Sequence, residues 1–164
     1  MDKNRSEFSK IYDTYSTKIY RFIFLKVSSQ EIAEDLASEV FIKAWGAFQA
    51  RQIENIQAYI YQVARNAIAD HYKGKKLQTV SVDETIEILD SQKPIEKQAM
   101  VSMEMDRVQK AISTINNDYQ DLIIWHYLDE LSVPEIAQIT GKTEENVRVG
   151  IHRALEALRG KVEA

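Results

Sequence analysis

The stretch SVPEIAQITGKTEENVRVGIHRALEALRG, residues 132–160, decides the fold of the C-terminal half of the chain. Ser132 followed by Glu135 is the capping-box pattern that opens a helix. Gly141 supplies the backbone conformation that a helix end often needs, and Thr143 is a suitable cap for the next helix. Two helices joined by a short turn containing glycine form a helix-turn-helix, which the pattern therefore predicts. The alternative interpretation is a helical hairpin inside a bundle with a solvated outer face.

The second helix of this motif is expected to present a polar face to a ligand. Arg148 lies near its N-terminus and suits a guanine edge or a phosphate, and Glu145 could accept a hydrogen bond from a cytosine amino group. Glu144 and Glu145 repel phosphate, although carboxylates also stabilise a helix N-terminus by about 0.3–1 kcal/mol. Gly150 costs about 1 kcal/mol relative to alanine in the middle of a helix, which is consistent with close approach of another backbone.

The composition favours an all-α protein. Only five glycines and two prolines occur in 164 residues, which suits helices joined by short turns, and 45% of the residues are hydrophobic. The absence of cysteine excludes disulfides, thiol catalysis and cysteine-based zinc sites. The longest uncharged stretch, 55–64, is about half a membrane span, and MDKNRSEFSK (1–10) has no apolar core. We therefore expect a cytoplasmic protein with no membrane insertion.

No pattern in the sequence predicts catalysis or a cofactor. The three histidines are far apart and belong to no metal-spaced cluster. Gly-rich phosphate loops, nucleophile elbows and HExxH motifs are also missing. The expectation is a protein that is not an enzyme and that uses neither a cofactor nor a metal.

Charge is distributed unevenly along the chain. The formal net charge of −4, from 21 basic and 25 acidic residues, argues at face value against a nucleic-acid partner. Residues 1–79 nevertheless carry 12 basic and 9 acidic residues, residues 80–106 carry 2 and 7, and residues 107–164 carry 7 and 9. We interpret this as two small helical domains, 1–76 and 94–164, joined by a flexible acidic linker over 77–93.

The N-terminal domain is expected to contain three helices, ending near 27, 48 and 75. Helical spacing places Tyr61, Arg65, Tyr72 and Lys76 on one side of the third helix, where unstacked bases could stack on the tyrosines while the cations hold the backbone. A solvated basic face is the alternative. The second helix carries a stripe of Glu31, Asp35, Ser38, Glu39 and Ile42, which is either a solvated face or a contact surface for a protein.

The strings AEDLASEVFIKAW (33–45), AYIYQVARNAIADHYKGKK (58–76) and LSVPEIAQITGKTEENVRVGIHRAL (131–155) together resemble those of extracytoplasmic-function (ECF) sigma factors. These are small sigma factors of bacterial RNA polymerase, and the resemblance spans nearly the whole chain. It implies core RNA polymerase and promoter DNA as partners, and an anti-sigma factor as a further partner.

The resemblance also implies a role for each surface. It places polymerase contacts at Asp35, Ser38, Glu39 and Ile42. It places contacts with the −10 element at Tyr59, Tyr61, Arg65, Asn66, Tyr72, Lys73 and Lys76. It places contacts with the −35 element at Thr143, Glu145, Asn146, Arg148, Val149, His152 and Arg153. The family usually has Trp at the position of Tyr59, small or basic residues at those of Val149 and Gly150, and a basic residue at that of Leu155.

Other classes of protein remain as alternatives. A helix-turn-helix regulator could bind operator DNA without touching polymerase, and the string SEVFIKAW (38–45) argues against it. A sigma-like decoy would bind partners through a DNA face that has decayed. Glu144, Glu145 and Gly150 are the residues that favour this last alternative.

Overall fold

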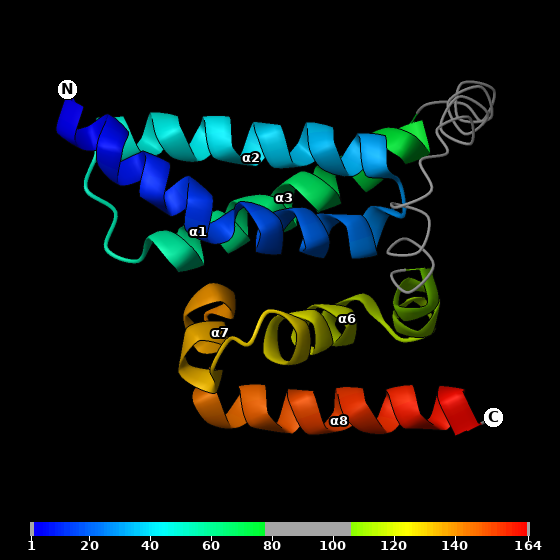
Figure 1. Ribbon diagram of the computed structural model, residues 1–164. Coiled ribbons are helices and arrows are strands. Elements are labelled where there is room, and N and C mark those ends of the chain that lie inside the picture. Colours follow the sequence, from blue (N-terminus) through cyan, green and yellow to red (C-terminus); the bar gives the residue numbers. More distant parts are fainter. Residues whose placement is uncertain (1, 78–105, 164) are drawn as a thin grey trace.

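The computed structural model describes residues 2–77 and 106–163, and side chains within 3–74 and 106–160. The N-terminal unit consists of α1 (Asp2–Val27), α2 (Gln30–Ala50) and α3 (Ile56–Leu77) (Figure 1). The C-terminal unit contains a helical segment at 106–113, α6 (Asn117–Ile123), the π-helix η1 (Ile124–Leu128), α7 (Val133–Thr140) and α8 (Glu144–Glu163). No strand occurs in these two ranges, which confirms the all-α prediction.

The turns follow from local sequence. Ser28 has a positive φ of 61°, and the Ser29 hydroxyl then accepts a hydrogen bond from the Ile32 amide to begin α2. Asn55 accepts a hydrogen bond from the Ala58 amide ahead of α3. The chain thus folds back sharply, so that α1, α2 and α3 pack side by side.

The helix-turn-helix has the predicted capping. The Ser132 hydroxyl accepts from the Glu135 amide at 3.2 Å, and the Glu135 carboxylate accepts from the Ser132 amide at 2.8 Å. Gly141 has a φ of 73°, in the left-handed region where a side chain would be strained. The backbone of Asn146 donates to the Thr143 hydroxyl at the start of α8. The structure therefore confirms the predicted capping box, the left-handed Gly141 and the Thr143 cap.

The helix that begins at Asn117 changes its hydrogen-bonding pattern partway along. The α-helix ends at Ile123 and continues as a π turn, in which the Asp129 amide donates to the Ile124 carbonyl. Such π turns are rare and occur frequently at functional sites. This one carries Trp125 and ends at Asp129, both of which are fully buried.

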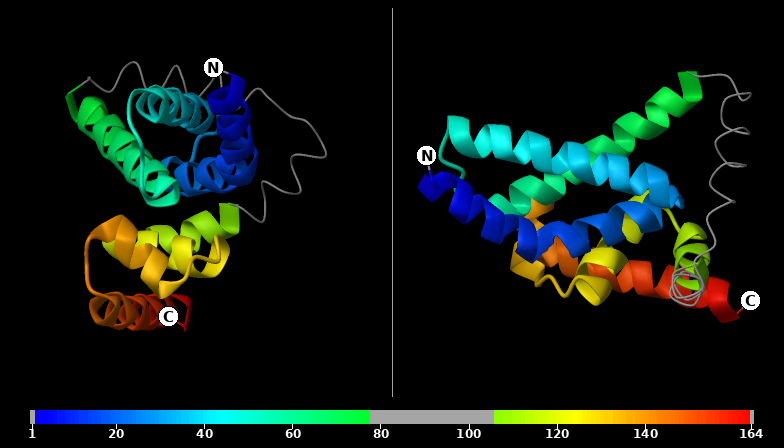
Figure 2. Two further views of the ribbon diagram at one scale, coloured as in Figure 1. Left: turned by 90° about the vertical axis from the view of Figure 1, so that its left-hand side faces the viewer. Right: turned by 45° about the horizontal axis from the view of Figure 1, so that its top comes forward.

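The linker predicted over 77–93 lies almost wholly outside the described residues. The domain boundaries at 76 and 94 therefore stay a prediction. Figure 2 shows the two units as separate layers, with α1–α3 on one side and α6–α8 on the other.

The two units nonetheless pack directly against each other. The ring of Trp125 lies 5.4 Å from that of Phe22 and 5.9 Å from that of Tyr61. The Arg21 guanidinium pairs with the Asp129 carboxylate at 2.6 Å, and the Lys26 ammonium pairs with the Asp121 carboxylate at 2.8 Å. The contact is therefore an apolar centre flanked by two ion pairs.

Candidate nucleic-acid interface

The outer face of α3 carries exposed polar side chains at Arg65, Asn66 and Lys73. Tyr72 is 41% exposed on the same helix, and its hydroxyl donates to the carbonyl of Lys26. Partial burial raises the pKa of Tyr72, so this phenol keeps the proton that it donates to Lys26. The side chain of Lys76 lies outside those that the structure describes.

Tyr59 lies at the N-terminal end of this face, in the first turn of α3. Its side chain is half-buried, and the Arg51 guanidinium lies 5.4 Å from the ring centroid in cation–π geometry. Arg51 was not among the predicted contacts. It belongs to the turn 51–55, and its stacking on an aromatic residue could be found only from the structure.

The placement of Tyr61 on the exposed face is wrong. Tyr61 is 0% exposed, and its hydroxyl donates to Asp129 of the C-terminal unit at 2.9 Å. Burial, followed by the charge and hydrogen bond of Asp129, raises the pKa of Tyr61 far above its ordinary value. Helical periodicity put Tyr61 on the side of α3 opposite its predicted buried face, but the Tyr61 ring lies 6.1 Å from that of Phe22 on α1. The C-terminal unit covers that side.

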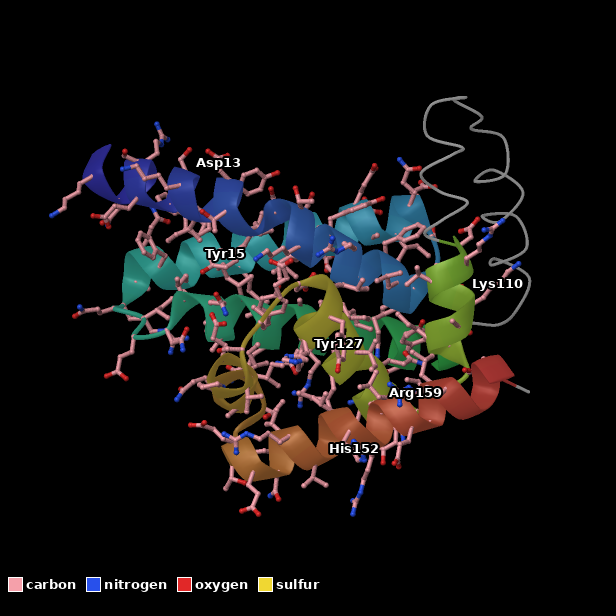
Figure 3. All side chains as sticks on the ribbon, turned by 60° about the horizontal axis from the view of Figure 1, so that its bottom comes forward. Asp13, Tyr15, Lys110, Tyr127, His152 and Arg159 are labelled. Atoms are coloured by element: carbon pink, nitrogen blue, oxygen red, sulfur yellow. The ribbon has the colours of Figure 1, made fainter. Side chains whose placement is uncertain are left out.

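The outer face of α8 matches the predicted set. The seven side chains proposed for the −35 element are all exposed: Thr143, Glu145, Asn146, Arg148, Val149, His152 and Arg153. The opposite side of α8 is buried through Val147, Ile151 and Ala154, and α8 packs on α6 and α7. Figure 3 shows His152 on the outer side of the helix.

Two ion pairs run along this outer face. Glu144 accepts from Arg148 at 3.5 Å, and Glu156 lies 3.0 Å from the ring of His152. All four side chains are more than half exposed. Exposed pairs of this spacing contribute little, about 0.3–0.5 kcal/mol each, so Arg148 can exchange its carboxylate for another anion at small cost.

Gly150 has a structural explanation. A Cβ atom at this position would lie 2.8 Å from Cδ1 of Leu122, closer than atoms can approach without a shift. The glycine therefore lets α6 pack closely on α8. The sequence indicated a close approach here but could not identify the Leu122 side chain as the neighbour.

The predicted polymerase contacts lie together on α2. Asp35, Ser38, Glu39 and Ile42 are all exposed, and Ile42 is 71% exposed despite its apolar side chain. Beside them a groove of about 840 Å³ runs between α1 and α2, and its lining includes Phe8, Tyr12, Phe41, Ile42 and Trp45. Tyr12 contributes to this lining from α1, which the stripe on α2 alone could not indicate.

The described residues hold no group of three or more histidine, aspartate or glutamate side chains arranged to bind a metal ion. Within the same residues, no helix has both the length and the apolar character needed to cross a bilayer.

The arrangement is that of a two-part helical protein whose second part ends in a helix-turn-helix with an exposed polar helix. A family model described as Sigma-70 region 2 matches residues 11–78. A second, described as Sigma-70, region 4, matches residues 105–158. The two models fall on the two structural units, in chain order.

Relatives and solved structures agree with these matches. The ECF RNA polymerase sigma factor BldN of Streptomyces coelicolor is 30% identical, and the alignment covers 92% of this chain and 58% of BldN. SigW of Bacillus subtilis, also an ECF RNA polymerase sigma factor, is 29% identical, with 95% of this chain and 89% of SigW covered. The structure of CnrH in complex with the cytosolic domain of CnrY aligns with a TM-score of 0.74 at 15% identity, covering 97% and 89% of the two chains.

These findings define the class as transcription initiation factors that bind DNA. Within that class, the chain belongs to the ECF RNA polymerase sigma factors. It is thus a sigma factor that binds RNA polymerase. The match of α1–α3 to region 2 argues against a regulator with a helix-turn-helix alone, because such a regulator does not need that unit.

Proposed function

We propose that each of the three exposed surfaces serves one step of promoter-specific initiation. The N-terminal unit docks on core polymerase through α2 and captures the opened −10 element through α3. The C-terminal unit reads the −35 element through α8. The observation that carries this assignment is that Arg65 and Lys73 on one unit, and Arg148 and Arg153 on the other, form two separate exposed faces.

The α2 surface has the properties of a protein interface. Ile42 is strongly exposed among polar neighbours, and exposed aliphatic side chains next to an apolar groove favour contact with another protein. The acids Asp35 and Glu39 provide charge complementarity for a basic partner surface. Together these properties favour polymerase docking on α2 over a face that is only solvated.

The α3 surface supports binding of unpaired bases. Tyr59 and Tyr72 offer aromatic rings, while Arg65 and Lys73 offer cations that can follow a backbone. Stacking of a base on an aromatic side chain contributes about 1–3 kcal/mol, comparable to the few kcal/mol that extrusion from the duplex costs. The protein thus shifts the equilibrium toward open DNA by binding, and polymerase carries out the chemistry in the cytoplasm.

The α8 surface supports recognition of duplex DNA. An exposed helix of a helix-turn-helix fits the major groove, and its N-terminal residues meet the base edges. Arg148 is the residue best placed for a guanine or a phosphate, because it lies in the first turns of α8. Glu144 and Glu145 restrict which groups can approach.

Run-off transcription tests the proposal directly. Purified chain is added to core polymerase on fragmented genomic DNA, and transcripts with discrete start sites are expected only when both are present. Arg65→Ala should reduce open-complex formation more than polymerase binding, whereas Lys10→Ala, which removes an exposed cation from α1, should change neither. Absence of any start site across the genome would overturn the proposed function.

The anti-sigma partner stays a prediction. A pull-down from cells of the source organism, with the α2 variant Ile42→Glu as a control, would test whether a dedicated protein binds this chain besides polymerase.

A further inference from the structure

The outer face of α8 points some of its side chains straight outward and others to the sides. The buried side of the helix consists of Val147, Ile151 and Ala154. At about 100° per residue, Glu145 and Val149 lie within about 30° of the direction opposite this buried side. Arg148 lies about 90° to one side of the outward direction, and Arg153 about 50° to the other. A helix that enters the major groove with this face forward aims the acid and the valine at the base edges, and the two arginines at the groove walls.

Arg148 is held toward its side of the helix by Glu144. Glu144 lies one turn earlier and about 40° further from the outward direction, and its carboxylate pairs with the Arg148 guanidinium at 3.5 Å. Both side chains are more than half exposed, so a phosphate can replace the carboxylate at small cost. The pair therefore turns Arg148 away from the base edges and toward the phosphates that line the groove.

Val149 places an apolar group at the centre of the outward face. Its side chain is 42% exposed, whereas the apolar side chains of Val147 and Ile151 are buried. In the major groove, the base group that an apolar side chain can recognise is the C5-methyl group of thymine. Val149 is thus suited to a thymine.

Glu145 restricts the base that its position accepts. A carboxylate at neutral pH only accepts hydrogen bonds, so the acceptors of guanine and of thymine repel it, and so does the N7 acceptor beside the amino group of adenine. The amino group of cytosine is the partner that remains. Four residues of helix rise about 6 Å, close to two base-pair steps of about 3.4 Å, so the bases facing Glu145 and Val149 lie within about two base pairs of each other.

We propose that α8 reads the −35 element through Glu145, which selects a cytosine, and Val149, which selects a nearby thymine, while Arg148 and Arg153 hold the phosphates on either side. This inference rests on the proposed function and adds to it the base groups that α8 recognises. It assigns Arg148 to a phosphate in preference to a guanine. Both base-reading residues lie in the first two turns of α8, which begins at Glu144, where a recognition helix meets the base edges.

A randomised promoter library tests these preferences in the holoenzyme. The strongest promoter found by run-off transcription is rebuilt with random base pairs across its −35 element, and the DNA bound by the full chain together with core polymerase is sequenced. The unaltered chain should prefer cytosine at one position and thymine within about two base pairs of it. Glu145→Gln should move the first preference from cytosine to adenine, because an amide can donate to N7 and accept from the amino group. Val149→Ala should weaken the thymine preference alone.

Removal of the thymine methyl group isolates the contact with Val149. Deoxyuridine in place of the selected thymine should weaken binding by the unaltered chain about fourfold, which is the effect of burying one methylene-sized group. The same replacement should have a smaller effect on Val149→Ala, because the shorter side chain leaves the methyl group without its neighbour.

A variant of Arg148 separates phosphate contacts from base contacts. Arg148→Ala should weaken binding of all library members alike, keep the sequence preference, and lower the slope of the salt dependence by about one. Lys110→Ala removes an exposed cation of the same unit outside α8 and should change neither the preference nor the affinity (Figure 3).

Three results would overturn the inference. They are an unchanged preference in both Glu145→Gln and Val149→Ala, loss of a guanine preference at a single position in Arg148→Ala, and equal binding of the deoxyuridine and thymine promoters. Discrete start sites with a −35 preference that depends on other residues would leave the proposed function standing. A holoenzyme with no sequence preference at the −35 element would instead refute the role of α8 in the proposed function.

Discussion

Tyr61→Phe isolates the hydroxyl that links the two structural units. The variant removes the hydroxyl that donates to Asp129 at 2.9 Å and keeps the ring that lies against Phe22 and Trp125. The substitution should therefore weaken the contact between the units while leaving the aromatic packing in place.

The magnitude follows from the charge and burial of the acceptor. A hydrogen bond to a charged group contributes about 1.5–3 kcal/mol, and Asp129 is fully buried, so water cannot replace the lost donor while the units are in contact. Arg21 still pairs with the same carboxylate, which limits the loss to this range. The free energy of unfolding should thus fall by about 1.5–3 kcal/mol. Tyr61→Ala removes the ring as well, at a further cost of about 3–5 kcal/mol to packing.

The assay is chemical denaturation of the full chain, which gives the free energy of unfolding of each variant. Tyr61→Phe should lower it by about 1.5–3 kcal/mol, and Tyr61→Ala should lower it further. Tyr127→Phe alters a tyrosine that is 48% exposed on the C-terminal unit and should leave the free energy of unfolding unchanged. If Tyr61→Phe is as stable as the unaltered chain, the stabilising role of the hydrogen bond to Asp129 is refuted.

Three further predictions concern the remaining surfaces. Arg148→Ala should weaken binding of a −35 duplex by about 1–3 kcal/mol, and unchanged binding in a mobility-shift titration would remove Arg148 from that interface. Ile42→Glu should lower the affinity for core polymerase at least about tenfold. The melting temperature should not change, because a side chain that is 71% exposed adds little to the core. An unchanged affinity in calorimetry would contradict the assignment of α2 as the polymerase contact. Burial raises the pKa of the Asp121 and Asp129 carboxyls, so their contribution to folding stability is complete below the ordinary aspartate pKa and is lost as pH rises through the raised values. The unaltered chain should therefore lose stability relative to Asp129→Asn as pH rises through that range, and a stability difference that stays constant with pH would refute this linkage. The charged and titratable groups that face the two carboxyls are Lys18, Arg21, Lys26, Tyr61, Arg65 and Asp118.

Local sequence signals predicted much of the C-terminal unit. Ser132, Glu135 and Gly141 act through neighbours within a few residues, so their effect on the backbone is fixed by the sequence around them. The exposed residues of α8 could be predicted from helical periodicity, because Val147 and Ile151 define the buried side of this helix. The helix-turn-helix and its polar face could therefore be predicted without knowledge of the tertiary structure.

The contact between the units could not be predicted in this way. Periodicity identifies which residues of a helix share a side, but it does not say which sides a separate unit will cover. Tyr61 was placed on an open face for this reason. Asp129 and Lys26 gave no signal either, because charged residues are ordinarily solvated, and only the tertiary contact shows that theirs are buried.

The burial of these charges changes the interpretation of the protein's net charge of −4. Acidic balance by itself predicts weak binding to free DNA through long-range repulsion, which salt screens. The structure adds a second cause, because two cations of the basic N-terminal unit are neutralised by Asp121 and Asp129 and part of α3 is covered. Repulsion weakens with ionic strength, whereas coverage by a largely buried contact does not. Weak DNA binding by the free chain that persists across ionic strengths would therefore reflect this coverage. Relief of that weakness in Arg21→Met, which removes the ion pair with Asp129, would identify the contact between the two units as its source.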